Sequence, residues 1–300
     1  MTADGLTDAV ARDVLATLLE TRVRNPGRIA ELAAARRLPQ ALVGETGRLL
    51  LVAADHGARG MLRAGARPLA MADRVDLLAR LRIALSRPGV DGVLGTADVL
   101  EDLLLLGALD GKVVIGSMNR GGLAGTRFEI DDRFTGYRAE AIAAMNLQGG
   151  KMLLRIDPED EASAPTLESC AHAIDALAAL GRMAMVEPFI SHRVGGRIRN
   201  DLTTEAVIRS CTVAAGLGST SAYTWLKLPV VDDMESVLAA TTLPALLLGG
   251  EVGDDQASQL LQWSKALAWP SVRGMVVGRS LLYPPDDDVA AAVDATVEMM

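Results

Sequence analysis

The chain has 300 residues, of which 50% are hydrophobic, and a formal net charge of −8. This length and composition fit one large hydrophobic core or two smaller ones, and they are typical of an α/β barrel. The negative charge and the lack of any lysine- or arginine-rich run argue against a nucleic-acid-binding or anionic-membrane surface. Small soluble molecules are therefore the expected partners.

The cysteines and the N-terminal sequence bear on location. Only Cys170 and Cys211 occur, each inside an apolar stretch with helical spacing, so the pattern predicts core thiols in a reducing compartment and no disulfide framework. The first residues are acidic and lack a signal-peptide pattern, and no segment reaches 18 uninterrupted apolar residues. We expect a cytoplasmic protein that does not associate with membranes.

The expected elements begin with two helices, at 6–20 and 27–36, which Asn25-Pro26-Gly27 separates. They belong to an N-terminal helical extension over 1–46. Eight short runs rich in Val, Leu and Ile then alternate with longer segments of helical spacing. The expected strands are 49–55, 92–94, 112–117, 151–156, 183–187, 224–230, 244–248 and 274–278. The expected helices are 73–86, 98–106, 136–146, 166–180, 203–215, 232–240, 254–267 and 286–298.

Eight strand–helix alternations predict a single (β/α)8 TIM barrel domain over 1–300. A doubly wound open sheet is less consistent with the sequence, because no G-x-G-x-x-G follows the first strand. The glycine-rich, mixed-charge segment 119–135 is an insertion after the third strand, on the face where barrel active sites lie. Two interpretations stay open for it, a substrate lid and a plain irregular loop.

Lys227 is the one charged residue in the apolar run from Tyr223 to Val231. A buried ammonium without a partner costs several kcal/mol, so a lysine buried in this way favours its neutral, nucleophilic form. The pattern indicates a Schiff-base enzyme. The alternative is a lysine at a strand tip whose amine extends into water.

Three further strand-end residues break the apolar pattern: Asp55, Lys151 and Glu187. In a barrel such residues converge on one mouth, and strand alternation allows Lys151, Glu187 and Lys227 to face the same cavity. A second ammonium lowers the proton affinity of Lys227, and a carboxylate supplies the proton transfers of carbinolamine chemistry. For Lys151, a solvated position at the start of its strand is the alternative.

An anion site is expected after the last two strands, where barrels commonly hold phosphate. Its candidate residues are Gly249, Gly250, Gly278, Arg279 and Ser280, although glycines after strands are also ordinary turn residues. His56 and Arg155 complete the expected substrate-binding set. With only three histidines, His56, His172 and His192, a metal site is poorly supported, and no cofactor is expected.

Over residues 47–284 the chain resembles the class I aldolases of the tagatose-bisphosphate and archaeal-type fructose-bisphosphate group, and it is similar to actinobacterial aldolase-like barrels. The segment 226–231 looks like the lysine strand of that group, with its following proline, and 151–157 looks like its strand-four lysine segment. Glu187 stands in the place of the strand-five acid. Asp55-His56-Gly57 resembles the opening signature of the archaeal-type enzymes.

The resemblance implies a role for each of these positions. Lys227 forms the iminium, Glu187 moves protons, Lys151 and Asp55 orient substrate oxygens, and Arg279 holds a phosphate. The chain departs from the pattern at Glu251, which follows Gly250, and in the arginine-bearing insertion 119–135. These departures leave the position of the phosphate, and so the sugar, undetermined.

The sequence thus favours a class I aldolase that cleaves a phosphorylated or similarly anionic ketose or deoxy sugar acid without a cofactor. Two alternatives stay open: a non-catalytic sugar-phosphate-binding barrel, and a cofactor-free isomerase in which a carboxylate is the base and Lys227 an electrophile. The sequence leaves the oligomeric state undetermined, and a homo-oligomer is compatible with it.

Overall fold

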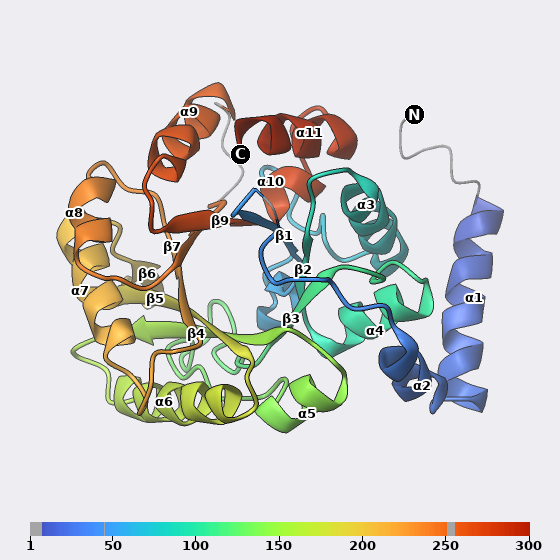
Figure 1. The fold of residues 1–300 in the computed structure, drawn as a ribbon, viewed down its shortest axis with the longest axis horizontal. Coiled ribbons are helices and arrows are strands. Elements are labelled where there is room, and N and C mark those ends of the chain that lie inside the picture. Colours follow the sequence, from blue (N-terminus) through green and yellow to red (C-terminus); the bar gives the residue numbers. More distant parts are fainter. Residues whose placement is uncertain (1–7, 45, 251–255) are drawn as a thin grey trace.

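A computed structural model describes residues 8–44, 46–250 and 256–300. Eight parallel strands pair in the order β1-β2-β3-β4-β5-β7-β8-β9, and β9 pairs back with β1. This pairing closes the sheet into a barrel with the helices around its outside (Figure 1). The predicted (β/α)8 barrel is confirmed.

The elements alternate along the chain as the sequence predicts, and most expected bounds agree within about three residues. The strands are β1 (Leu49–Ala53), β2 (Gly92–Gly95), β3 (Val113–Ser117), β4 (Gly149–Ile156), β5 (Met183–Val194), β6 (Arg197–Asn200), β7 (Thr224–Leu228), β8 (Ala245–Leu248) and β9 (Val272–Val277). The helices are α1 (Asp8–Arg24), α2 (Arg28–Ala35), the 3-10 helix η2 (His56–Arg59), α3 (Arg74–Ser86), α4 (Ala97–Leu105), α5 (Ala139–Ala144), α6 (Ser163–Ala179), α7 (Thr204–Ala215), α8 (Met234–Ala239), α9 (Gln256–Leu267), α10 (Arg279–Leu282) and α11 (Val289–Met299).

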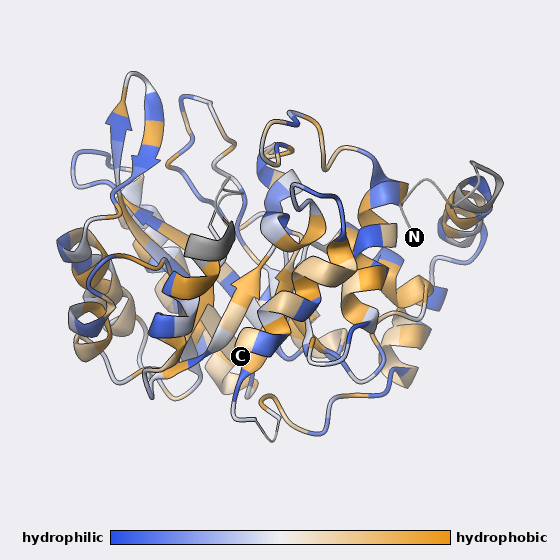
Figure 2. Cartoon of the chain, turned by 90° about the horizontal axis from the view of Figure 1, so that it is seen from above, coloured by the Kyte–Doolittle hydropathy of each residue, from blue (hydrophilic) through white to orange (hydrophobic). Residues whose placement is uncertain are grey.

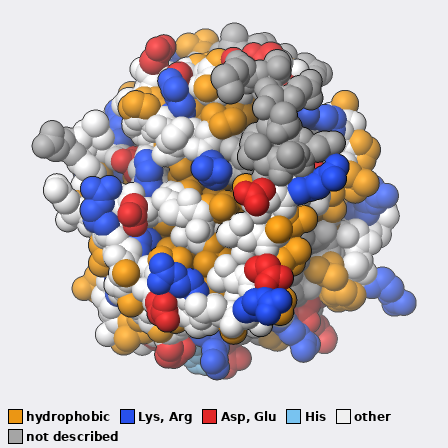
Figure 3. All heavy atoms as spheres, turned by 90° about the vertical axis from the view of Figure 1, so that its right-hand side faces the viewer, with side chains coloured by type: hydrophobic (Ala, Val, Ile, Leu, Met, Phe, Trp, Pro, Cys, Tyr) orange, Lys and Arg blue, Asp and Glu red, His pale blue; other side chains and the backbone are white. Residues whose placement is uncertain are grey.

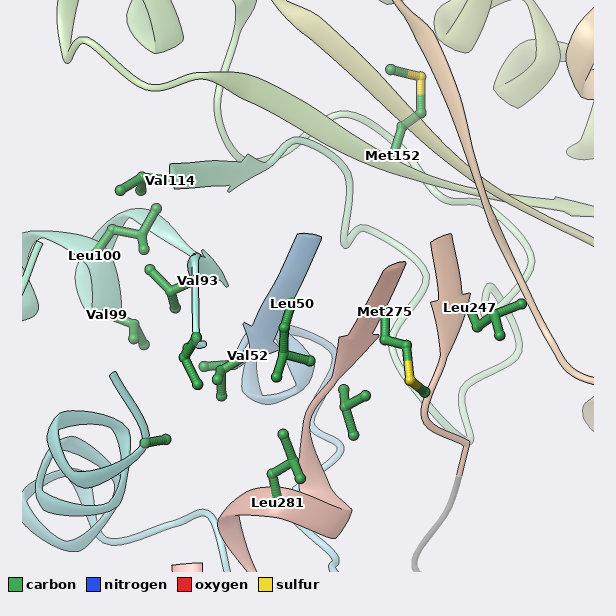
Figure 4. Packing of buried hydrophobic residues seen from close by; sticks show 14 of the residues in the cluster. Leu50, Val52, Val93, Val99, Leu100, Val114, Met152, Leu247, Met275 and Leu281 are labelled. Atoms are coloured by element: carbon green, nitrogen blue, oxygen red, sulfur yellow. The ribbon is translucent and has the colours of Figure 1, made fainter. Parts of the chain in front are cut away.

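Alternation along the strands separates two apolar layers. In β1, Leu49 and Leu51 belong to the cluster inside the barrel, whereas Leu50 and Val52 belong to the cluster between the strands and the helices. Figure 4 shows this outer layer, in which β1 side chains lie near Leu281 of α10. Side chains alternate with a period of two along each strand. The inward-facing positions that follow the apolar interior residues therefore lie at the carboxyl end of the barrel.

Side-chain caps fix where several barrel helices begin. The carboxylate of Asp73 accepts hydrogen bonds from the backbone N–H groups of Val75 and Asp76 at the start of α3. Thr203, Asp233 and Asp288 cap α7, α8 and α11 in the same way. Such caps satisfy amide groups that have no partner within the helix, each typically worth about 1 kcal/mol.

The N-terminal helices pack on the side and bottom of the barrel. Arg22 of α1 donates to Glu101 at 2.9 Å and to Asp102 at 2.8 Å, which ties α1 to α4. Arg36, next to α2, is buried and donates to the carbonyls of Leu109, Lys112 and Asn146. These contacts anchor the extension to the segments that precede β3 and β4.

The strand expected at 183–187 is seven residues longer than predicted. β5 continues to Val194 and forms an antiparallel hairpin with β6, an element absent from the predicted set. Gly195 and Gly196 both have positive φ, at 58° and 79°, as a tight hairpin turn requires. Figure 2 shows the hairpin extending beyond the body of the barrel.

The described surface carries charges of both signs. On the face that Figure 3 shows, basic and acidic side chains are interspersed and do not gather into one patch. Within 8–44, 46–250 and 256–300, no helix combines the length and apolarity needed to cross a membrane.

Candidate functional site

The site lies on the inward positions that follow the apolar interior of the barrel. Asp55 comes two residues after Ala53, Ser117 two after Ile115, and Glu187 two after Met185. Lys151 and Lys227 occupy the corresponding positions of β4 and β7, two residues after Gly149 and Trp225. The strand period therefore brings five polar side chains from five segments to one end of the barrel.

Glu187 lies between the two lysines. Its Oε1 accepts a hydrogen bond from Lys227 Nζ at 2.7 Å, and its Oε2 forms an ion pair with Lys151 Nζ. Lys151 Nζ also lies 3.4 Å from Oδ2 of Asp55. The expected cluster of Asp55, Lys151, Glu187 and Lys227 is thus one continuous network of buried charges.

Both lysines are inside the protein. Lys151 is fully buried and Lys227 is 5% exposed, while Glu187 is 8% exposed. The structure therefore contradicts the alternatives of a solvated Lys151 and of a Lys227 amine extending into water. Of the two lysines, Lys227 keeps a small exposed fraction and Lys151 keeps none.

Burial controls the ionisation of this cluster. It lowers the pKa of Lys227 from the ordinary 10.5, with the nearby cations Arg120 and Arg279 adding to the decrease and Glu187 opposing it. Burial also lowers the pKa of Lys151 well below its ordinary value, and Arg120 contributes again. For Glu187, burial acts to raise the pKa, but Lys151, Lys227 and Arg120 outweigh it and hold the pKa well below 4.5. Glu187 is therefore ionised in this structure.

Arg120, from the 119–135 insertion, joins the cluster. Its Nη2 forms an ion pair with Oδ2 of Asp55, the atom that also accepts from Ser117 Oγ at 3.1 Å. Arg120 is buried, and burial lowers its pKa to about 10, so it stays a cation at neutral pH. The insertion thus supplies a charge directly to the lysine site.

Several of the expected anion-binding residues lie beside this cluster. Gly249 follows β8 and its N–H donates to Val276 of β9, which places the ends of these two strands side by side. Gly278 and Arg279 follow β9, and the charge of Arg279 is near enough to lower the pKa of both Lys227 and His56. The side-chain hydroxyl of Ser280 is buried. Gly250 is exposed with a φ of 69°, and Glu251 lies outside the described residues.

His56 approaches the site where Gly278 has no side chain. A methyl group on Gly278 would come 2.8 Å from Cε1 of His56 and 2.6 Å from the carbonyl of Ala53. Burial, with the cations Arg279 and Lys227, lowers the pKa of His56 to about 3. His56 is therefore neutral at physiological pH and offers hydrogen bonds, not a positive charge, to a ligand.

The side chain of Arg155 is buried and pairs with carboxylates of the insertion. Its Nε and Nη2 donate to the carboxylate of Asp132 at 2.8 and 2.9 Å, and Nη1 donates to Glu129 at 3.3 Å. Arg59 of η2 reaches the same glutamate at 3.4 Å and the carbonyl of Gly122 at 3.0 Å. The structure thus assigns Arg155 to anchoring the insertion, and this geometry does not favour the expected substrate contact.

These anchors favour the irregular-loop interpretation of the insertion. It has no helix or strand, but Asn119 holds its start by bonds to the backbone of Leu153, and two buried arginines hold its middle. It is an irregular loop fixed to the barrel, and it contributes Arg120 to the site.

Replacing Arg155 with methionine should destabilise the protein by about 3–5 kcal/mol, because it leaves the fully buried Asp132 without its main partner. Urea unfolding of the variant measures this loss. Arg133→Met is the matched control in the same insertion, since the Arg133 side chain is 79% exposed, and it should leave stability unchanged. Equal stabilities for the two variants would show that Arg155 does not anchor the loop.

Two surface hollows lie away from the cluster. One, of about 510 Å³, is bordered by Arg82, Ile83 and Leu106 of the α3 and α4 region. The other, of about 460 Å³, is at the bottom of the barrel around Trp225 and Arg273. In the part of the chain that the structure describes, no group of three or more His, Cys, Asp and Glu residues is arranged to hold a metal ion.

The comparisons with known proteins agree with this architecture. The barrel has the fold of a Schiff-base-forming fructose-1,6-bisphosphate aldolase, at 19% identity and a TM-score of 0.64, covering 90% of this chain and 99% of that one. It is also similar to an archaeal fructose-1,6-bisphosphate aldolase whose catalytic lysine is bound to a carbinolamine intermediate, at 18% identity and a TM-score of 0.65, over 90% and 98% of the two chains. These similarities show that the chain has the (β/α)8 barrel fold of these aldolases.

The chain belongs to the Cgl0159-like family, whose model matches residues 47–297. The crystal structure of Cgl0159 from Corynebacterium glutamicum has 52% sequence identity and a TM-score of 0.93, covering 96% of each chain. The comparison with curated proteins gives no significant match.

Proposed function

We propose that the protein is a class I aldolase, which reversibly cleaves a phosphorylated or similarly anionic ketose or deoxy sugar acid through a Schiff base on Lys227. The observation that carries the proposal is the contact of 2.7 Å between Lys227 Nζ and a buried Glu187 carboxylate that also binds Lys151. A buried amine with a lowered pKa is a nucleophile, and a carboxylate in contact with it is placed for proton transfer.

The reaction begins with the neutral amine of Lys227. It attacks the carbonyl carbon of the substrate and forms a carbinolamine, and the carbinolamine oxygen then leaves as water after it takes up a proton. The resulting iminium ion withdraws electrons from the neighbouring carbon–carbon bond. No separate cofactor is needed for this step.

Cleavage requires a base. Glu187 removes the proton from the hydroxyl group β to the iminium, and the electrons of the breaking carbon–carbon bond move into the iminium to give an enamine and a free carbonyl product. Protonation of the enamine carbon regenerates an iminium, and water hydrolyses it to release the second product and the free amine. The low pKa of Glu187 keeps it ionised before this transfer.

The remaining residues position the substrate. Lys151 and Asp55 are next to Glu187 and are suited to bind substrate oxygens, while Gly249, Gly278, Ser280 and the cation of Arg279 are suited to hold an anionic group after β8 and β9. Neutral His56 supplies a further hydrogen bond.

Borohydride reduction tests the proposal. The protein is incubated with a panel of ketoses and ketose phosphates, reduced, digested and mapped by mass spectrometry. The chain contains four lysines, Lys112, Lys151, Lys227 and Lys265, so the adduct is assigned to one residue directly. We expect it on Lys227. A ligand that stabilises the protein thermally without being consumed would indicate a binding protein, and turnover without any adduct would indicate an isomerase.

Adduct formation should depend on pH through Lys227. Only the neutral amine reacts, so the rate should rise with pH and level off below 10.5, since burial and the cations Arg120 and Arg279 lower this pKa. Replacing Arg120 with glutamine removes one of these cations and should move the rise to higher pH. The measurement is the rate of reductive trapping between pH 5 and about 11. A rise centred at the ordinary lysine pKa in the wild type would contradict the buried-amine mechanism.

A further inference from the structure

Arg120 and Asp55 leave complementary hydrogen-bonding atoms unused. Among the described residues, Nε of Arg120 and Oδ1 of Asp55 are buried and have no hydrogen-bond partner. Three donors, Ser117 Oγ, Arg120 Nη2 and Lys151 Nζ, all converge on the other oxygen of Asp55, Oδ2. One donor and one acceptor are therefore unsatisfied at adjoining side chains of the lysine site.

The unpaired Nε–H of Arg120 lowers the stability of the folded protein unless a ligand accepts its hydrogen bond. A buried guanidinium has five N–H donors, and leaving one unpaired costs about 1–3 kcal/mol or more because the group is charged. Arg155 illustrates a satisfied case in the same loop, since its Nε, Nη1 and Nη2 all donate to carboxyl or carbonyl oxygens. Arg120 has one carboxylate contact, and its Nε is unused.

We propose that Arg120 binds an anionic group of the substrate, a carboxylate or a phosphate, while Oδ1 of Asp55 accepts a hydrogen bond from a neighbouring substrate hydroxyl. The proposal rests on the proposed aldolase function and specifies its substrate as a ketone with an anion and a hydroxyl near one another. Guanidinium forks match both anions geometrically. This site is separate from the one expected after β8 and β9, because Arg120 follows β3.

Binding of the anion also changes the cluster electrostatically. Arg120 lowers the pKa of both lysines, so a negative group on Arg120 offsets part of this effect. The anion contacts the unused Nε of Arg120 and the substrate hydroxyl contacts the unused Oδ1 of Asp55, so the ion pair between the two side chains stays in place.

The test compares pairs of ketones in which one member carries an anionic group where the other carries a neutral hydroxyl or hydroxymethyl group. Borohydride trapping on Lys227 is measured as a function of ketone concentration for dihydroxyacetone phosphate against dihydroxyacetone, and for pyruvate against hydroxyacetone. The first pair reports recognition of phosphate and the second recognition of carboxylate. The ratio of half-saturating concentrations within a pair removes any change in the reactivity of Lys227 that is common to both ketones.

In Arg120→Gln, the advantage of the anionic ketone should fall by about 10- to 150-fold in at least one pair, which corresponds to a hydrogen-bonded charge. Arg133→Gln, a substitution at the exposed arginine of the same insertion, should leave both ratios unchanged. If Arg120→Gln weakens neutral and anionic ketones equally, Arg120 acts only on the amine and the proposal is overturned.

Two further measurements cover the remaining cases. If Arg120→Gln does not fold, the double variant Asp55→Asn/Arg120→Gln removes both charges of the ion pair, and its ratios are compared with those of Asp55→Asn.

If the wild type forms no adduct, the Schiff-base function fails, and calorimetric titration of Lys227→Met with dihydroxyacetone phosphate or pyruvate still tests the site. Equal affinities of Lys227→Met and Arg120→Gln/Lys227→Met for both anions would overturn the role of Arg120, and a loss in the double variant would support it.

Discussion

Replacing Lys227 with methionine is expected to lower turnover by on the order of 10⁶-fold and to remove the borohydride adduct, because the substitution deletes the nucleophile and keeps the side-chain volume. The fold should remain, since Glu187 keeps its contact with Lys151 when Lys227 is neutralised. The measurements are steady-state turnover, mass mapping after reduction, and thermal unfolding.

Lys265→Met is the matched control for this substitution. Lys265 is an exposed lysine of α9, and its replacement should leave turnover and the adduct on Lys227 unchanged. Full turnover by Lys227→Met would eliminate the mechanism. An adduct that forms on Lys151 in the wild type would instead move the nucleophile to β4.

Replacing Glu187 with glutamine should lower the rate of carbon–carbon cleavage by about 10²–10⁴-fold, the usual contribution of a positioned acid or base. Adduct formation should survive, because the loss of the carboxylate removes the main group that opposes the lowered pKa of Lys227. The variant should therefore be trapped by borohydride and still turn over slowly. Single-turnover kinetics separate the two steps.

Glu205→Gln is the control for the Glu187 variant. Glu205 is an exposed carboxylate on α7 that pairs with Arg209, and its replacement should change neither step. If Glu187→Gln cleaves substrate at the wild-type rate, another group is the base. If its adduct also disappears, Glu187 acts before cleavage as well.

The sequence predicted the barrel because the apolar runs and the helical segments alternate with clear periods. The same period of two predicted that Lys151, Glu187 and Lys227 face the inside of the barrel. β4 begins at Gly149, two residues before Lys151, so the lysine lies within the strand and not at its first position. The start of α6 was expected at 166, after Pro165, but the helix begins at Ser163, since proline is tolerated in a first turn.

The features that were missed depend on the loops or on contacts between distant segments. Arg120 lies in a loop without periodicity, and its partner Asp55 is 65 residues away. Arg155 was predicted to bind substrate, but it pairs with Glu129 and Asp132 of the insertion, whose position the sequence does not reveal. The β5–β6 hairpin did have a signal, because Gly195-Gly196 between Val194 and Arg197 is a typical two-residue turn.

The shared counter-ions of the site constrain how the family diverges. Glu187 balances two lysines, and Asp55 balances Lys151 and Arg120, so replacing either carboxylate alone leaves a buried cation without its counter-ion. Epistasis is the consequence: an evolutionary route to a different substrate must alter several of these positions together, and family members should show correlated replacements at 55, 120, 151 and 187.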